Sequence, residues 1–137
     1  MTSWSYEAFE STGSGRDGVT EMELRVTEKL EKLGPRAEYA KVVMTNIVEG
    51  AARAVVYSPD KTLSLPVINK IEKWTKGDVN TIAHDRDTER YEEEMYQEIN
   101  KLLNSLADMQ AARSKISATA YKNGYSTISI WYPAEIS

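Results

Sequence analysis

A glycine-rich stretch near the N-terminus carries the spacing G-x-G-x-x-G, which in other proteins brings a backbone turn close to a phosphate group. Its three glycines are Gly13, Gly15 and Gly18. The stretch follows residues 3–9, a weakly alternating segment typical of a strand, and precedes an amphipathic segment over 19–33. The first N–H groups of such a helix, with Arg16 beside them, can bind an anion. A dinucleotide-binding fold also needs a second parallel strand, whereas 36–57 has the pattern of a helix, so a turn-forming loop is the competing interpretation.

A second cluster combines lysines with a tryptophan. It consists of Lys70, Lys73 and Trp74, with Lys76 following on the same segment. Ammonium groups beside an indole can hold a nucleotide or a stretch of RNA through charge and stacking. The same pattern arises when lysine stems cover the edge of a buried tryptophan. The sequence leaves both interpretations open.

The single histidine, His84, lies among carboxylates. Asp85, Asp87 and Glu89 can bind a magnesium ion, or they can cap a helix and complement its dipole. One histidine without cysteine is a poor basis for a zinc site. The acidic run over 92–98 is typical of a solvated helix face rather than of paired catalytic carboxylates. We therefore predict no catalytic residues, no metal and no cofactor.

Four helices are expected to position these groups. They are predicted over residues 19–33, 36–57, 66–75 and about 85–121. The first ends at Gly34-Pro35, a common helix stop. The fourth is the longest because neither glycine nor proline interrupts residues 78–123.

The two ends of the chain are predicted to form strands. Residues 124–133 are rich in β-branched and aromatic residues that alternate, and we expect them to pair with residues 3–9. The predicted fold class is α+β, mainly α, in one domain over 1–137. Residues 1–18 are assigned to a strand and a glycine-rich loop, 19–121 to helices, and 124–133 to a strand.

The predicted fourth helix carries a continuous apolar seam. The seam positions follow one another at intervals of four and three residues, and all but position 113 are apolar. The apolar members are Met95, Ile99, Leu102, Leu106, Met109 and Ile116. Arg113 is the polar member, and it can sit at a solvated edge, set the register of an assembly or hold an anionic ligand. A helix of about 37 residues is ~55 Å long, whereas a domain of this size is roughly 35–40 Å across. The seam therefore predicts a homo-oligomer, and packing within one chain is the alternative.

Composition limits the function further. The chain has 137 residues, a net charge of −4 and no cysteine, which excludes disulfides and thiolate chemistry. An acidic chain is poorly suited to a phosphate backbone, so we do not expect nucleic acid as a partner, although a local basic patch remains compatible with this charge. No secretory signal or membrane span is seen, and a cytoplasmic location is expected.

These features favour a non-enzymatic binding or inhibitor-type protein. It would occupy a partner protein or sequester a small anionic ligand, as many accessory proteins do, phage-encoded ones among them. The first alternative is a nucleotide- or phosphate-binding protein with its site between subunits. The second is a hydrolase that uses carboxylates and a divalent metal.

Overall fold

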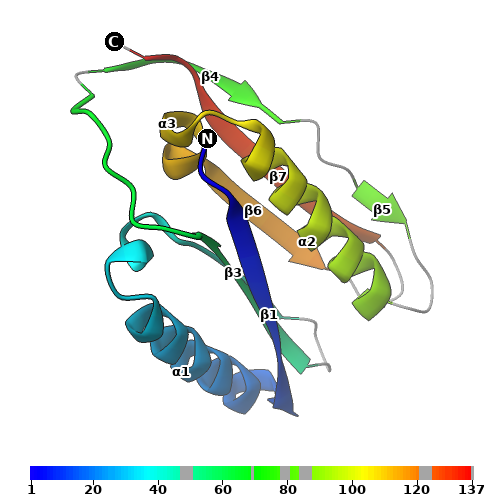
Figure 1. Ribbon diagram of the computed structural model, residues 1–137. Coiled ribbons are helices and arrows are strands. Elements are labelled where there is room, and N and C mark those ends of the chain that lie inside the picture. The colour runs from blue at the N-terminus through cyan, green and yellow to red at the C-terminus, as the bar shows by residue number, and fades with distance from the viewer. Residues whose placement is uncertain (47–50, 69, 78–80, 84–87, 121–124, 137) are drawn as a thin grey trace.

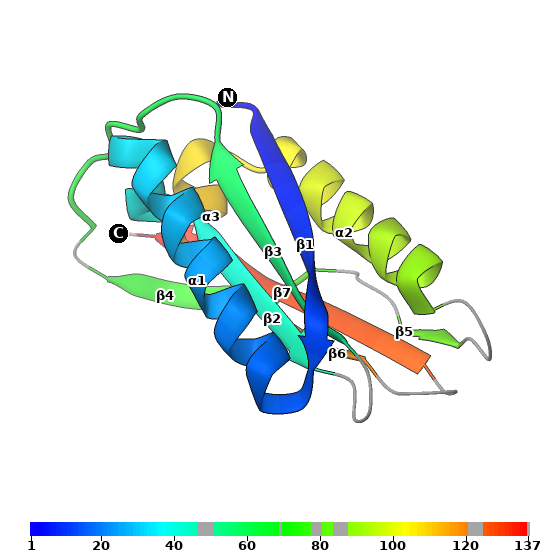
Figure 2. The same cartoon turned by 90° about the horizontal axis from the view of Figure 1, so that it is seen from below.

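The computed structural model describes residues 1–46, 51–68, 70–77, 81–83, 88–120 and 125–136. Within these residues the chain forms two antiparallel sheets on which helices pack (Figure 1, Figure 2). The strands are β1 (Trp4–Ser14), β2 (Lys41–Asn46), β3 (Ala51–Pro59), β4 (Ile71–Lys76), β5 (Thr81–Ala83), β6 (Lys115–Ala120) and β7 (Tyr125–Ile136). The helical segments are α1 (Gly15–Leu33), the 3-10 helix η1 (Gly34–Tyr39), α2 (Thr88–Ser105) and α3 (Asp108–Arg113).

The first sheet is a split crossover. Its strand order is β1-β3-β2, so β3 lies between the two strands that α1 connects. Because β3 is antiparallel to both neighbours, β1 and β2 run parallel to each other. The β-branched pairs Val42-Val43 and Val55-Val56 favour the extended conformation of β2 and β3.

The second sheet repeats this arrangement with the C-terminal half of the chain. Trp131 of β7 lies opposite Lys76 of β4 on one side and Lys115 of β6 on the other, so β7 is the central strand. The strands β4 and β5 precede α2, whereas β6 and β7 follow it. The first half is therefore a strand, a helix and two further strands, whereas the second half has two strands, two helices and two further strands. In both halves the last strand lies in the middle of its sheet. The two halves meet where β2 lies beside β6.

The helix α1 covers one face of the first sheet. Its buried residues Met22, Val26 and Leu33 pack on the buried Ala52, Ala54 and Val56 of β3. Small side chains on the strand allow the helix to approach closely. The amphipathic helix expected over 19–33 is confirmed, with its start at Gly15 rather than Val19.

The helix α2 packs between the other face of the first sheet and the second sheet (Figure 1). Its buried residues are Met95, Tyr96, Ile99 and Leu103. They belong to one core with Val55 and Tyr57 of β3 and with Ile128 and Ile130 of β7. The Tyr57 hydroxyl donates a hydrogen bond to the Tyr96 carbonyl over 3.1 Å, which satisfies the buried phenol. This shared core holds the two halves of the chain together.

The helices expected over 36–57 and 66–75 are wrong. The first range contains η1, β2 and β3, and the second contains β4. Along β3 nearly every residue is buried, because α1 covers one face and α2 the other. A strand buried on both faces shows no alternation, so its apolar residues also fit a helical spacing.

The long helix expected over 85–121 is also wrong, and the described fold is not mainly α. α2 ends at Ser105, whose hydroxyl donates to the Leu102 carbonyl, and α3 ends at Arg113. Residues 115–120 form β6 instead, with Ile116 opposite Ile130 of β7. Strand pairing with a distant segment therefore overrides the local helical pattern.

The two terminal strands exist, but they do not pair with each other. β1 pairs with β3 in the first sheet, whereas β7 is the central strand of the second. The partners of β1 and β7 are the strands that the sequence pattern had assigned to helices. Correcting those helices therefore also corrects the pairing.

Candidate functional site

A pocket of about 600 Å³ opens where three segments meet. Tyr39 enters it from the end of η1, Arg113 from the end of α3, and residues 65–68, 70 and 71 from the segment leading into β4. Five of the eight lining residues are apolar, namely Leu65, Pro66, Val67, Ile68 and Ile71. The other three, Tyr39, Lys70 and Arg113, carry polar or charged groups. Apolar walls with a few convergent polar groups are typical of small-molecule sites.

Arg113 has the chemistry of an anion ligand in this pocket. Its Cζ lies 5.9 Å from the centre of the Tyr39 ring, a cation–π distance. Its Nη1 is buried and has no hydrogen-bond partner among the described residues. Burying a polar N–H without a partner costs roughly 1–3 kcal/mol, and because Arg113 lines the pocket, an anion bound there would meet the positive charge of its guanidinium.

A second cation, Lys41, lies close behind Arg113. Its ammonium donates a hydrogen bond to the carbonyl of Ala112, the residue before Arg113. Burial, followed by repulsion from Lys115 and Arg113, lowers the pKa of Lys41 to about 8. The neighbourhood is therefore electrostatically positive, which favours an anion at Arg113.

Sequence reasoning missed Lys41 and Tyr39 because it placed both in a helix over 36–57. The pattern Lys41-Val42-Val43 after the proline turn at Pro35 is the available signal. It indicates a strand whose first residue lies at the edge of the core.

The basic-aromatic cluster is divided between two surfaces. Lys70 lines the pocket, whereas Lys73 and Trp74 lie further along β4. Trp74 is 39% exposed, so it is not the buried tryptophan that the alternative interpretation, with lysine stems covering its edge, requires. Of the proposed ligand-binding residues, the structure brings Lys70 and Arg113 together.

The glycine-rich motif forms the turn from β1 into α1. Gly15 has a φ of +59°, a conformation that favours glycine. A Cβ on Gly18 would come within 2.8 Å of the Gly13 carbonyl oxygen, so Gly18 lets the helix pack on the strand. The Glu21 carboxylate accepts hydrogen bonds from the N–H and hydroxyl of Thr12, which places negative charge at this turn. The motif, with the exposed Arg16, does not line the pocket.

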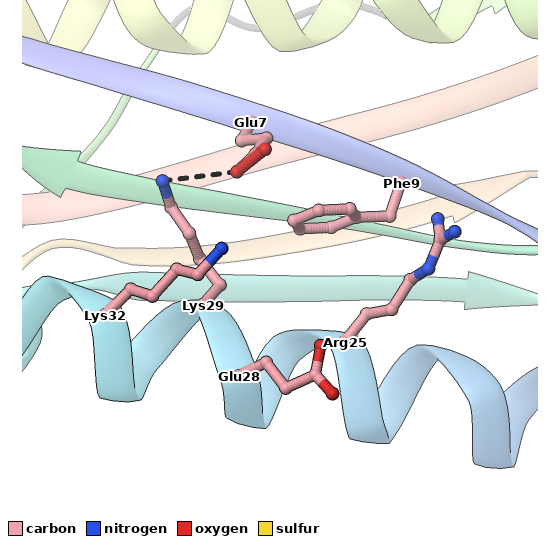
Figure 3. A pocket seen from close by; sticks show the side chains of 6 residues that line it. All are labelled: Glu7, Phe9, Arg25, Glu28, Lys29 and Lys32. Carbon is pink, nitrogen blue, oxygen red and sulfur yellow. Dashed lines mark ion pairs between the residues drawn. The ribbon is translucent and has the colours of Figure 1, made fainter.

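A smaller pocket of about 330 Å³ lies between β1 and α1 (Figure 3). The Lys29 ammonium forms an ion pair of 3.2 Å with the Glu7 carboxylate across it. The Arg25 guanidinium carbon lies 6.0 Å from the centre of the Phe9 ring. The pocket has three cations, Arg25, Lys29 and Lys32, but Lys29 is already paired with Glu7. Because Glu7 and Glu28 both add negative charge here, we expect a weaker anion site than the one at Arg113.

The apolar seam is used inside the chain. Met95, Ile99 and Leu106 are buried, Leu102 and Ile116 pack against the same core, and Met109 is partly buried. The predicted seam is thus divided between α2, α3 and β6 rather than presented along one helix.

The magnesium site considered above uses Asp85, Asp87 and Glu89. Asp85 and Asp87, like His84, lie outside the described residues, whereas Glu89 belongs to α2. The described residues contain no group of three or more histidine, aspartate or glutamate side chains that could hold a metal. None of their helices is long and apolar enough to cross a membrane.

Comparisons of the chain with protein-family models, with curated proteins and with solved structures find no match. We therefore infer a function from the chemistry of the pocket itself.

Proposed function

We propose that this protein is a non-enzymatic binding protein that sequesters a small anionic ligand in the pocket between Tyr39, Arg113 and residues 65–68, 70 and 71. One observation supports this most directly. Arg113 lines a pocket large enough for a small molecule, and its buried Nη1 has no protein partner among the described residues. Buried polar groups without a partner are uncommon in folded proteins, so this guanidinium is a candidate for an interaction that the chain itself does not supply.

The pocket favours a ligand with two parts. A carboxylate or phosphate suits the planar guanidinium of Arg113, which can form two parallel hydrogen bonds. The ammonium of Lys70 adds a second positive charge at the wall. The apolar side chains of residues 65–68 favour a ligand whose body is aliphatic or aromatic, because burying it removes apolar surface from water.

Homo-oligomerisation remains a prediction. The long helix expected as its interface is withdrawn, because its described residues are divided between α2, α3 and β6. Native mass spectrometry of protein purified without denaturation measures the subunit number and any retained ligand in one experiment. We expect an additional mass of a few hundred daltons, as roughly suits a pocket of this volume.

Thermal unfolding with a ligand panel tests the pocket. The panel contains aliphatic carboxylates, aromatic carboxylates and nucleoside monophosphates, each at a concentration near saturation. A ligand at 100 times its Kd stabilises the folded state by ~2.7 kcal/mol, which raises Tm by several degrees. We expect this increase for at least one amphipathic anion and none for its neutral amide or nucleoside.

Variants connect the shift to Arg113. Arg113→Met keeps a long side chain without charge and is expected to abolish the increase in Tm. Lys101→Met removes the same charge from an exposed site on α2 and serves as the matched control. If Arg113→Met still binds as tightly as the natural chain, or if no anion shifts Tm, the proposed function is wrong.

A further inference from the structure

The second sheet has an exposed face opposite the one that α2 covers. Along β7, Ile128 and Ile130 point into the core, so Ser129 and Trp131, which alternate with them, lie on the other face of the sheet. Trp131 is one of these and is 38% exposed. Its direct cross-strand neighbours are Lys76 on β4 and Lys115 on β6, and opposite residues in antiparallel strands share a face. A lysine, a tryptophan and a lysine therefore form one row across three strands.

Further residues extend this face along the strands. Ser129, two residues before Trp131, lies opposite Ser117 of β6 and adds hydroxyl groups. Trp74, two residues before Lys76, is 39% exposed on β4. The third tryptophan of the chain, Trp4, is only 2% exposed. Leaving two large indoles in water is unfavourable, so a surface that does so is a candidate for recognition.

The row Lys76–Trp131–Lys115 is positive although the chain is acidic and Glu72, an exposed carboxylate, lies further along β4. Lys76 and Lys115 are exposed, and neither has an ion-pair partner among the described residues. α2 packs on the opposite face of this sheet, so the exposed carboxylates of Glu94 and Glu98 project from the other side of the molecule. The net charge of −4 therefore does not describe the charge of this face.

We propose that this face binds single-stranded nucleic acid, with one base stacked on Trp131 and backbone phosphates at Lys76 and Lys115. Neighbouring strands are about 4.8 Å apart, so the two lysines flank the indole closely on both sides. An exposed indole accepts the flat face of a base, and flanking ammonium groups neutralise the phosphates on either side of it. An acidic peptide would use the charge but would leave the indole without a flat partner.

Fluorescence anisotropy of a labelled dT12 oligonucleotide at 50 mM salt tests the proposal. Stacking on one aromatic side chain contributes enough that its loss weakens affinity roughly 5- to 150-fold, which we expect for Trp131→Leu. Trp131→Phe keeps a ring and is expected to bind within a few-fold of the natural chain. Leucine keeps apolar area without a π face, so the pair separates stacking from simple hydrophobic contact.

The salt dependence of binding tests the two lysines together, independently of stacking on Trp131. Each phosphate contact to a single strand contributes about 0.7 to the slope of log K against log salt, so Lys76→Ala with Lys115→Ala should reduce that slope by about 1.4. Lys101→Ala on α2 removes an exposed lysine elsewhere and should leave the slope unchanged. Circular dichroism and Tm of each variant show that it is folded.

Three results would overturn the proposal. The first is no binding of dT12 at 50 mM salt by the folded natural chain. The second is equal affinity of Trp131→Leu and the natural chain. The third is equal competition by dextran sulfate, a polyanion without bases, which would instead indicate an anionic polysaccharide. The inference is independent of the Arg113 pocket: Arg113→Met should still bind dT12, and Trp131→Leu should still show the ligand-dependent shift in Tm.

Discussion

The guanidinium carbon of Arg113 lies 5.9 Å from the centre of the Tyr39 ring, and this contact joins the two halves of the chain. Tyr39 ends η1 just before β2, whereas Arg113 ends α3 just before β6. The strands β2 and β6 lie side by side, so the pocket opens at the boundary between the two halves of the chain. A site built this way exists only when both halves are folded.

Arg113→Met tests whether Arg113 serves binding rather than stability. The change removes a buried donor that has no partner among the described residues, and it retains most of the apolar stem. Without ligand, we expect the free energy of unfolding to stay within about 1 kcal/mol of the natural chain or to increase. Urea unfolding measures it. A loss above about 2 kcal/mol would assign Arg113 a structural role instead.

Lys41 predicts a rise in stability with pH. Its pKa is lowered from 10.5 to about 8 in the folded chain, mainly by burial. Below pH 8 both states hold the proton, and the penalty of burying the charge is fully present. Between pH 8 and pH 10.5 the unfolded state binds more protons, so stability increases with pH. We expect a gain of at most about 2 kcal/mol between pH 7 and pH 9.5, measured by urea unfolding.

Two tyrosines set the upper limit of that window. Burial raises the pKa of Tyr57, and burial together with Glu93 raises that of Tyr6 to about 12. A tyrosine whose folded pKa is raised keeps its proton up to a higher pH when folded, so stability falls as pH increases above 10.

The variant Lys41→Met tests the role of Lys41. It should be more stable than the natural chain at pH 7 and should lose the rise in stability between pH 7 and 9.5. An unchanged rise in this variant would assign the effect to another group.

Gly77 is required where α2 meets the second sheet. A Cβ at this position would lie 2.5 Å from Cγ2 of Ile130 and 2.7 Å from Cδ2 of Leu102. The Gly77 N–H also donates to the Ile130 carbonyl over 2.7 Å, so the backbone cannot easily move away. We expect Gly77→Ala to destabilise the fold by about 1–3 kcal/mol in urea unfolding.

The substitution Gly13→Ala is the matched control for Gly77→Ala. A Cβ at Gly13 would make only an ordinary contact of 3.7 Å with the Cβ of Asp17. We expect this change to alter the free energy of unfolding by less than about 0.5 kcal/mol. Equal effects of the two substitutions would show that overpacking at Gly77 is not the cause.

Asn104 attaches the edge of the first sheet to α2. Its Oδ1 accepts from the Trp4 N–H over 2.6 Å, and its Nδ2 donates to the Trp4 carbonyl over 3.1 Å. Asn104→Leu leaves both partners of β1 unpaired and should cost about 1–3 kcal/mol. Hydrogen exchange at the start of β1 should become faster while exchange in β3 changes less. Uniform acceleration across the chain would instead indicate global unfolding.

Local patterns were sufficient for the elements whose two faces differ. Residues 19–33 are apolar on one side only, so their period identified α1, and the alternation of Ile128 and Ile130 with polar residues identified β7. Glycine content located the passage from a strand to a helix, but the loop expected there is wrong, because β1 leads directly into α1 between Ser14 and Gly15. Lys70, Trp74 and Arg113 were selected because their residue types are suited to anions and bases.

Distant contacts decided the rest. Val55 and Val56 are both buried, since helices cover both faces of β3, and such a strand has no period that separates it from a helix. Ile116 continued the helical spacing of α2, but hydrogen bonding to β7 placed it in a strand. The pocket brings Tyr39 to Arg113, 74 positions further along the chain, and the row brings Lys76 to Trp131, 55 positions further. Side-chain types are local properties of the sequence, whereas the pairing of strands that brings them together depends on which distant surfaces can be buried against each other.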